Sequence, residues 1–267
     1  MKRWPLLLSL ALWAGCAAHR APDLDPHAVS VDRQITLNAH PMLVHVVDAR
    51  QHPDGPLLVY ATGDRGWAGK DLEVYRRLVS WGYPVAGFDA HEYVTHLGKN
   101  VSTTTPPQLA KDYEAIIATA RDALHLPPGL PVVLIGVSRG AGLAVIAGGQ
   151  RGLRRTLSGI VAIGLTREEE YVRWYRRIGR HPATTMDMVE VYDYLPRLHQ
   201  LPLTVIQSTR DNYLPAASAR ALFGDDTDNR RLIAIDAKNH SFAGARERLY
   251  ETLHEAVTSM ADQKPYD

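Results

Sequence analysis

A serine in the middle of the chain has the surroundings of a nucleophile. Residues 136–140 read GVSRG, the G-x-S-x-G pattern of a nucleophile elbow. The apolar run 132–135 precedes them, and the small and apolar residues 139–149 predict a tightly packed helix after them. In such a strand–turn–helix unit, the turn would raise the Ser138 hydroxyl above the sheet edge, and the helix start would favour an oxyanion beside it. The alternative is a glycine-rich turn that packs a helix against a strand.

Two more residues could complete a catalytic triad with Ser138. A serine hydroxyl is a poor nucleophile until a base takes its proton, and an acid must orient that base. Asp211 follows one predicted strand and His240 follows the next, in the order Ser, acid, His that accompanies this elbow in enzymes. The sequence therefore predicts the triad Ser138–Asp211–His240. Asp236 is the alternative acid; taken alone, Asp211 could be a turn residue and His240 a surface residue.

Backbone N–H groups are predicted to hold the oxyanion that forms during attack. One belongs to Arg139, which follows the nucleophile, and the second to Asp64, in the loop 62–67 (TGDRGW) after an early strand. The alternative for this loop is a glycine turn before a helix. The predicted chemistry is attack of Ser138 on an ester carbonyl, an acyl-enzyme, and its hydrolysis by water. This chemistry needs no metal and no organic cofactor.

The elements that must position these residues alternate from residue 29 onward. Strands are predicted at 31–37, 42–47, 56–61, 84–88, 132–135, 160–165, 203–207 and 232–235, and helices at 70–80, 106–126, 139–149 and 246–260. Strands that are apolar throughout, separated by amphipathic helices, indicate a mostly parallel sheet with helices on both faces. The predicted fold class is therefore α/β, with the active site at the carboxyl ends of the strands.

Residues 166–200 interrupt this alternation and are predicted to form a short cap insertion over the site. Glu168, Glu169 and Glu170 could hold a cationic group of a substrate. The aromatic residues and arginines of 171–177 suit a lipid headgroup interface. The simpler interpretation of the same residues is a solvated cap surface.

Composition indicates one folded domain, at residues 29–267. The chain has 267 residues, of which 45% are hydrophobic and 22% charged, which is ordinary for a globular protein. Its 30 basic and 29 acidic residues give a net charge of +1, without the basic surplus of a nucleic-acid-binding protein. Cys16 is the single cysteine, so neither an intramolecular disulfide nor a cysteine metal site is expected.

The N-terminus predicts export. Residues 1–16 read MKRWPLLLSLALWAGC: two basic residues, an apolar stretch too short to span a bilayer comfortably, and a lipobox-like end at Cys16. A lipidated Cys16 would anchor a periplasmic protein to a membrane, with the Pro- and Ala-rich residues 17–28 as linker. The alternatives are an ordinary signal cleaved near Ala18, which gives a soluble secreted protein, and a buried first helix.

Three segments together resemble the bacterial VirJ/AcvB virulence-protein family: TGDRGW at 62–67, GVSRGA at 136–141 and NHSF at 239–242. The resemblance extends over roughly residues 57–257. It implies an exported serine hydrolase of the α/β-hydrolase fold. AcvB-type members are associated with hydrolysis of aminoacyl-phosphatidylglycerol, especially lysyl-phosphatidylglycerol, at the periplasmic membrane face. VirJ-type members are associated with type IV secretion, which implies a secretion-system or envelope protein as partner.

Three functions are therefore open. The first is an exported serine hydrolase acting on an ester, with an aminoacyl-phospholipid as the substrate that the resemblance implies. The second is a general periplasmic esterase acting on small or cell-wall esters. The third is a non-catalytic accessory protein that uses a hydrolase fold for binding. A complete triad counts against the third function, because binding does not require all three residues.

Overall fold

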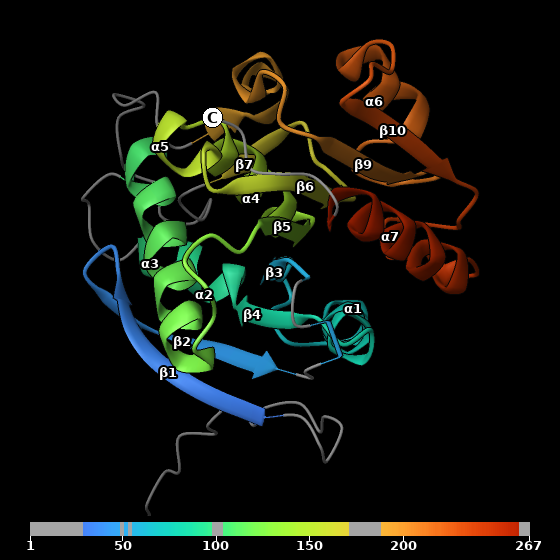
Figure 1. Cartoon of the computed structure of the whole chain (residues 1–267). Coiled ribbons are helices and arrows are strands. Elements are labelled where there is room, and N and C mark those ends of the chain that lie inside the picture. The colour runs from blue at the N-terminus through green and yellow to red at the C-terminus, as the bar shows by residue number, and fades with distance from the viewer. Residues whose placement is uncertain (1–28, 49–50, 53–54, 98–103, 171–187, 262–267) are drawn as a thin grey trace, which may run out of the picture.

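The structure is a computed structural model, and it describes residues 29–48, 51–52, 55–97, 104–170 and 188–261. Within these residues, eight strands form one sheet in the order β1-β2-β4-β3-β5-β6-β9-β10 (Figure 1). The strands are β1 Val29–Leu37, β2 His40–Asp48, β3 Leu57–Ala61, β4 Pro84–Phe88, β5 Val132–Val137, β6 Leu157–Ile163, β9 Leu203–Ser208 and β10 Arg230–Ile235. All neighbours from β4 to β10 pair in parallel. The predicted mostly parallel sheet is confirmed.

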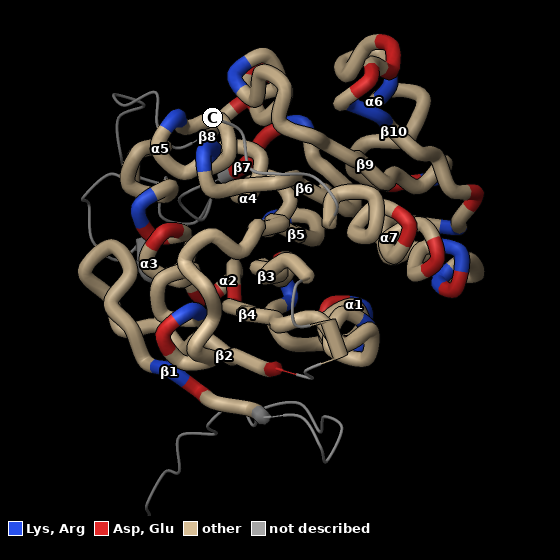
Figure 2. Tube along the Cα trace, in the orientation of Figure 1, with Lys and Arg blue, Asp and Glu red and all other residues tan. Residues whose placement is uncertain are grey.

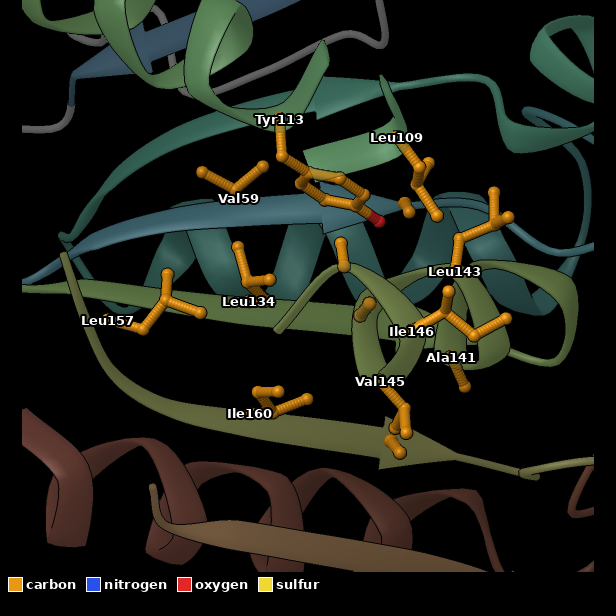
Figure 3. Close-up of a cluster of buried hydrophobic side chains, with 14 of the residues drawn as sticks. Val59, Leu109, Tyr113, Leu134, Ala141, Leu143, Val145, Ile146, Leu157 and Ile160 are labelled. Carbon is orange, nitrogen blue, oxygen red and sulfur yellow. The ribbon is translucent and has the colours of Figure 1, made fainter. Parts of the chain in front are cut away.

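Helices cover both faces of the sheet. The helices α3 (Pro106–Leu124) and α4 (Arg139–Gly148) pack on one face, and α1 (Lys70–Ser80) and α7 (Arg246–Ala261) pack on the other (Figure 1). Figure 3 shows side chains of α3 and α4 packed with those of the central strands. Alternate residues of β5 contribute to the cores on the two faces, which explains why this strand is apolar throughout.

The boundaries of α3 follow from its end residues. The Thr105 side chain accepts a hydrogen bond from the Gln108 N–H, and prolines occupy the first turn. His125 adopts a left-handed conformation, with φ of 53°, and ends the helix after Leu124. The helix is therefore two residues shorter than the predicted 106–126.

An antiparallel hairpin of β1 and β2 extends the parallel sheet at one edge. Asn38 and Ala39 form its turn, with φ of 44° and 66°. The Asn38 N–H donates to Asp112 of α3, at 3.2 Å, and the Asn38 side chain donates to Thr104, at 2.7 Å. The predicted strand pair is confirmed, with a tighter turn than the expected 38–41.

Short elements that the periodicity did not indicate complete the fold. These are α2 Ala90–Leu97, α5 Arg151–Arg154, α6 Ala216–Phe223 and, in the predicted cap, β7 Glu168–Glu170, β8 Met188–Glu190 and the 3₁₀ helix η2 Val191–Leu198. The strands β7 and β8 form an antiparallel pair beside the main sheet. Residues 171–187 of the cap lie outside the described residues, as do the predicted export signal with Cys16 and the linker 17–28.

Acidic and basic residues are interspersed along the chain (Figure 2), in agreement with the near-neutral net charge. Among the helices that the structure describes, none has the length and hydropathy needed to cross a bilayer.

The second glycine of the elbow is predicted to be essential for packing. A Cβ atom at Gly140 would lie 2.3 Å from the Ala61 carbonyl oxygen and 2.6 Å from that of Thr62. Since backbone must move, we expect Gly140→Ala to lower Tm by about 3–10 °C, which corresponds to about 1–3 kcal/mol. Gly129→Ala is the control, because a Cβ at that exposed position meets nothing within 4 Å. Equal Tm values for Gly140→Ala and Gly129→Ala would contradict the prediction.

Candidate active site

Ser138 lies at the turn between β5 and α4, as predicted. Its backbone has φ of 52° and ψ of −113°, a strained conformation for a residue with a side chain. The Ser138 N–H donates to the Ile163 carbonyl at 2.8 Å, which ties the turn to β6. A Cβ at Gly136 would lie 2.1 Å from the Gly140 carbonyl oxygen, so the turn can close only around a glycine. These features are those of a nucleophile elbow.

His240 and Asp211 form a buried hydrogen-bonded pair. Asp211 follows β9 and His240 follows β10, and the distance from His240 Nδ1 to Asp211 Oδ2 is 2.7 Å. The other carboxylate oxygen of Asp211 accepts the N–H groups of Tyr213, at 2.8 Å, and Leu214, at 3.3 Å. A carboxylate held in this way accepts the Nδ1 proton and leaves Nε2 as the basic nitrogen.

Electrostatics keep Asp211 charged. Burial raises the pKa of Asp211, but the hydrogen bond and charge of His240 and the two backbone N–H groups outweigh burial, so the pKa lies below its usual value. Gln207 also donates to Asp211 Oδ2, at 3.2 Å, a contact that the sequence did not indicate. The alternative acid, Asp236, has an 80% exposed side chain that pairs with Arg210. The geometry thus favours Asp211 over Asp236 as the acid that orients His240.

Ser138 and His240 line the same cavity, which has a volume of about 630 Å³. The loops that follow β3, β5, β9 and β10 form its wall together with residues 166–169 of the cap. His240 Nε2 is buried and has no hydrogen-bond partner among the described residues. The nucleophile and base of an unliganded enzyme often come within hydrogen-bond distance only when substrate binds.

Both predicted oxyanion donors lie in the wall of this cavity. Arg139 is the first residue of α4, where N–H groups have no acceptor within the helix. Asp64 belongs to the loop after β3, which the Gly140 N–H holds by donating to the Thr62 carbonyl at 3.1 Å. The Arg139 and Asp64 side chains also pair with each other, with Nε 2.7 Å from Oδ1. Burial raises the pKa of Asp64, but Arg139 and His91 together outweigh burial, so this pKa lies below its usual value.

The glutamates of the cap differ in their surroundings. Glu169 is buried, accepts a hydrogen bond from the Thr166 hydroxyl at 2.7 Å, and lies 3.6 Å from the Arg139 guanidinium. Glu168 is exposed at the cavity. The Arg139 guanidinium already lies beside Glu169, so Glu169 is a poor candidate for binding the predicted cationic group of a substrate. The side chain of Glu170 lies outside the described residues.

Sequence reasoning missed two charged residues in the cavity wall. Lys70 and Asp71, in the first turn of α1, are 7% and 4% exposed. Lys70 donates to the His240 carbonyl at 3.4 Å. Burial lowers the pKa of Lys70 and raises that of Asp71. Their position at the start of the helix that follows the loop 62–67 was a signal, but charges at a helix start usually face solvent.

Tyr213 is a third missed residue. Its side chain is 69% exposed, lines the cavity, and lies with its ring 4.9 Å from that of His240.

No group of three or more His, Cys, Asp or Glu side chains that could hold a metal ion occurs in the described part of the chain.

Comparison with known proteins gives a family match. The model of a family described as bacterial virulence protein (VirJ) matches residues 56–176. This stretch contains the loop 62–67 and the elbow, so the predicted resemblance to this family is confirmed there. No curated protein sequence matches the chain significantly.

Several solved structures share the fold. Est1E from Butyrivibrio proteoclasticus has a TM-score of 0.63 at 14% identity, covering 86% of this chain and 98% of its own. The Pyrococcus furiosus esterase Pf2001 has a TM-score of 0.63 at 16% identity, covering 87% and 91%. A dienelactone hydrolase from Anabaena variabilis has a TM-score of 0.60 at 16% identity, covering 87% and 98%. At these identities the similarity establishes the α/β-hydrolase fold, which confirms the predicted fold class.

Proposed function

Since residues 56–176 match the VirJ family and the fold is that of α/β-hydrolases, we propose that the protein is a serine hydrolase that cleaves carboxylic esters. One observation carries the proposal. The strained elbow serine and the hydrogen-bonded His240–Asp211 pair line one cavity, at the carboxyl ends of the strands. The esterases among the structural neighbours support the same reaction class.

The proposed reaction follows from the placement of these groups. Ser138 Oγ attacks the ester carbonyl while His240 Nε2 takes its proton, and the Asp64 and Arg139 N–H groups hold the oxyanion. When the tetrahedral intermediate collapses, the C–O bond to the alcohol breaks, and His240 gives the proton to the leaving oxygen. Water then attacks the acyl-enzyme with His240 again as base, which releases the acid and restores Ser138.

For the substrate, we propose an aminoacyl-phospholipid, with lysyl-phosphatidylglycerol as the first candidate. The family match supports this choice, and so does the mixture of charges in the cavity wall, where Lys70, Arg246 and Asp71 lie close to the triad. A lipidated Cys16 would place the enzyme at the periplasmic membrane surface where this lipid occurs. A general esterase with small-ester substrates is the second candidate, supported by the esterases that share the fold.

The experiment compares release of lysine from lysyl-phosphatidylglycerol vesicles with hydrolysis of short acyl esters, using wild type and Ser138→Ala. Lysine release by wild type alone supports the lipid substrate. Hydrolysis of short esters alone leaves the general esterase. If folded wild type hydrolyses neither and is not labelled by a fluorophosphonate probe, the hydrolase proposal is wrong, and the accessory role becomes the better account.

The ion pair between the two oxyanion residues is predicted to position the hole. Arg139→Met and Asp64→Asn each remove the pair but keep the backbone N–H groups. Because the Asp64 side chain is 60% exposed, we expect a moderate effect: about 3- to 10-fold lower kcat in each single variant. The double variant should be only slightly slower than the poorer single variant, because the pair is the contact that both changes remove, whereas Glu169 beside Arg139 and His91 beside Asp64 are each affected by one change alone. Fully multiplicative losses in kcat would show that the two side chains act independently.

A further inference from the structure

One oxygen of a buried carboxylate in the catalytic cavity has no partner. Asp71 lines this cavity and is 4% exposed, and its Oδ1 atom has no hydrogen-bond partner among the described residues. A buried carboxylate oxygen without a donor is costly, so such a group calls for an explanation. A donor carried by a substrate would supply one.

Burial raises the pKa of Asp71, and the charge of the neighbouring Lys70, which lowers this pKa, does not outweigh burial. Lys70 precedes Asp71 on α1, and adjacent residues of a helix point in different directions. The Lys70 ammonium group donates instead to the His240 carbonyl, and no ion pair joins it to Asp71 in the part of the chain that the structure describes. Oδ1 of Asp71 therefore retains acceptor capacity.

Other acids near the triad already have partners. Asp64 pairs with Arg139, Glu169 accepts from Thr166, and Asp211 accepts from His240. Within the described residues, Asp71 is the buried carboxylate of this wall that can accept another hydrogen bond.

Asp71 lies against the predicted oxyanion loop. The Gly63 N–H donates to its carboxylate, and a Cβ at Gly63 would lie 3.3 Å from Oδ1 and 3.4 Å from Oδ2. Gly63 directly precedes Asp64, whose N–H is the predicted donor to the oxyanion. His240 is also close enough to act electrostatically on Asp71. A group bound at Asp71 would therefore lie beside the oxyanion loop.

We propose that Asp71 Oδ1 binds the protonated α-amino group of an aminoacyl ester substrate. The α-nitrogen is one carbon away from the carbonyl carbon, which matches the position of Asp71 beside the oxyanion loop. This inference rests on the proposed hydrolase function and specifies it further. The enzyme recognises the α-amino group that all common aminoacyl esters share, and not the side chain of one amino acid.

The test uses two esters that differ only in this amino group, L-alanyl glycerol and propionyl glycerol. Rates for wild type and Asp71→Asn are divided by the spontaneous hydrolysis rate of the same ester, because an α-ammonium group activates its own ester. We expect Asp71→Asn to lower kcat/KM for the alanyl ester about 10- to 100-fold and to change that for the propionyl ester less than about 3-fold. Asp225→Asn makes the same change at an exposed site outside the cavity and should alter neither.

Each other outcome overturns the inference. Equal losses on both esters would show that Asp71 positions the oxyanion loop and does not bind the amino group. If Asp71→Asn does not fold, wild type alone decides: corrected rates without preference for the alanyl ester contradict the proposal. If a fluorophosphonate labels wild type but wild type shows no preference for the alanyl ester, the inference about Asp71 fails and the hydrolase proposal is kept. Wild type that is neither labelled nor active overturns both.

Discussion

Replacing Ser138 with alanine is expected to abolish ester hydrolysis, with kcat at least about 10³-fold lower, and to leave the fold intact. The reason is that Ser138 is the hydroxyl that the strained turn between β5 and α4 presents to the cavity it shares with His240. The Ser138 side chain is half-buried, and His240 Nε2 has no partner among the described residues, so the substitution breaks no hydrogen bond between Ser138 and His240. Labelling by a fluorophosphonate probe and hydrolysis of a short ester measure the effect.

Ser138→Gly is the matched control for the backbone. Glycine also removes the nucleophile, but it adopts the φ of 52° at this position without strain. We expect this variant to be as inactive as Ser138→Ala. It should unfold at a higher temperature than Ser138→Ala, because a side chain in this backbone conformation costs about 1–3 kcal/mol of strain. Full labelling of either variant would show that the nucleophile is a different residue.

Replacing Asp211 with asparagine is expected to lower kcat about 10³- to 10⁴-fold at neutral pH. An amide can donate to His240 Nδ1, which favours the tautomer with the proton on Nε2, where the base must be free. The control is Asp236→Asn, which removes the alternative acid at an exposed site and should keep nearly full activity. If Asp236→Asn is the inactive variant, the acid has been assigned to the wrong loop.

Asp211 also predicts a dependence of stability on pH. Its pKa is lowered in the folded protein, so its ionised form stabilises the fold above the unfolded pKa of about 3.9. This stabilisation is lost as pH falls from about 4 through the lower folded pKa. Thermal unfolding of wild type and Asp211→Asn should therefore differ most at neutral pH and converge in acid. A difference in Tm that stays constant from pH 7 to 3 would contradict this prediction.

Local patterns were enough to predict the sheet, the elbow and the order of the triad. The strands β3, β5, β6 and β9 are buried on both faces, so their residues are mostly apolar without alternation, and each strand is recognisable from its own segment. The elbow needs glycines on both sides of Ser138, because other backbone atoms lie where side chains would stand. These requirements are local in the sequence, and the topology then brings the strand ends to one edge.

The choice of the acid, the Asp64–Arg139 pair and the burial of Asp71 depended on tertiary structure. Asp64 and Arg139 are 75 positions apart, and their contact arises only when β3 and β5 lie side by side. Asp211 and Asp236 follow adjacent strands alike, and only packing buries the first and exposes the second. Charge patterns along one segment do not show which neighbours will cover a residue, because desolvation and pairing come from segments that are distant in the chain.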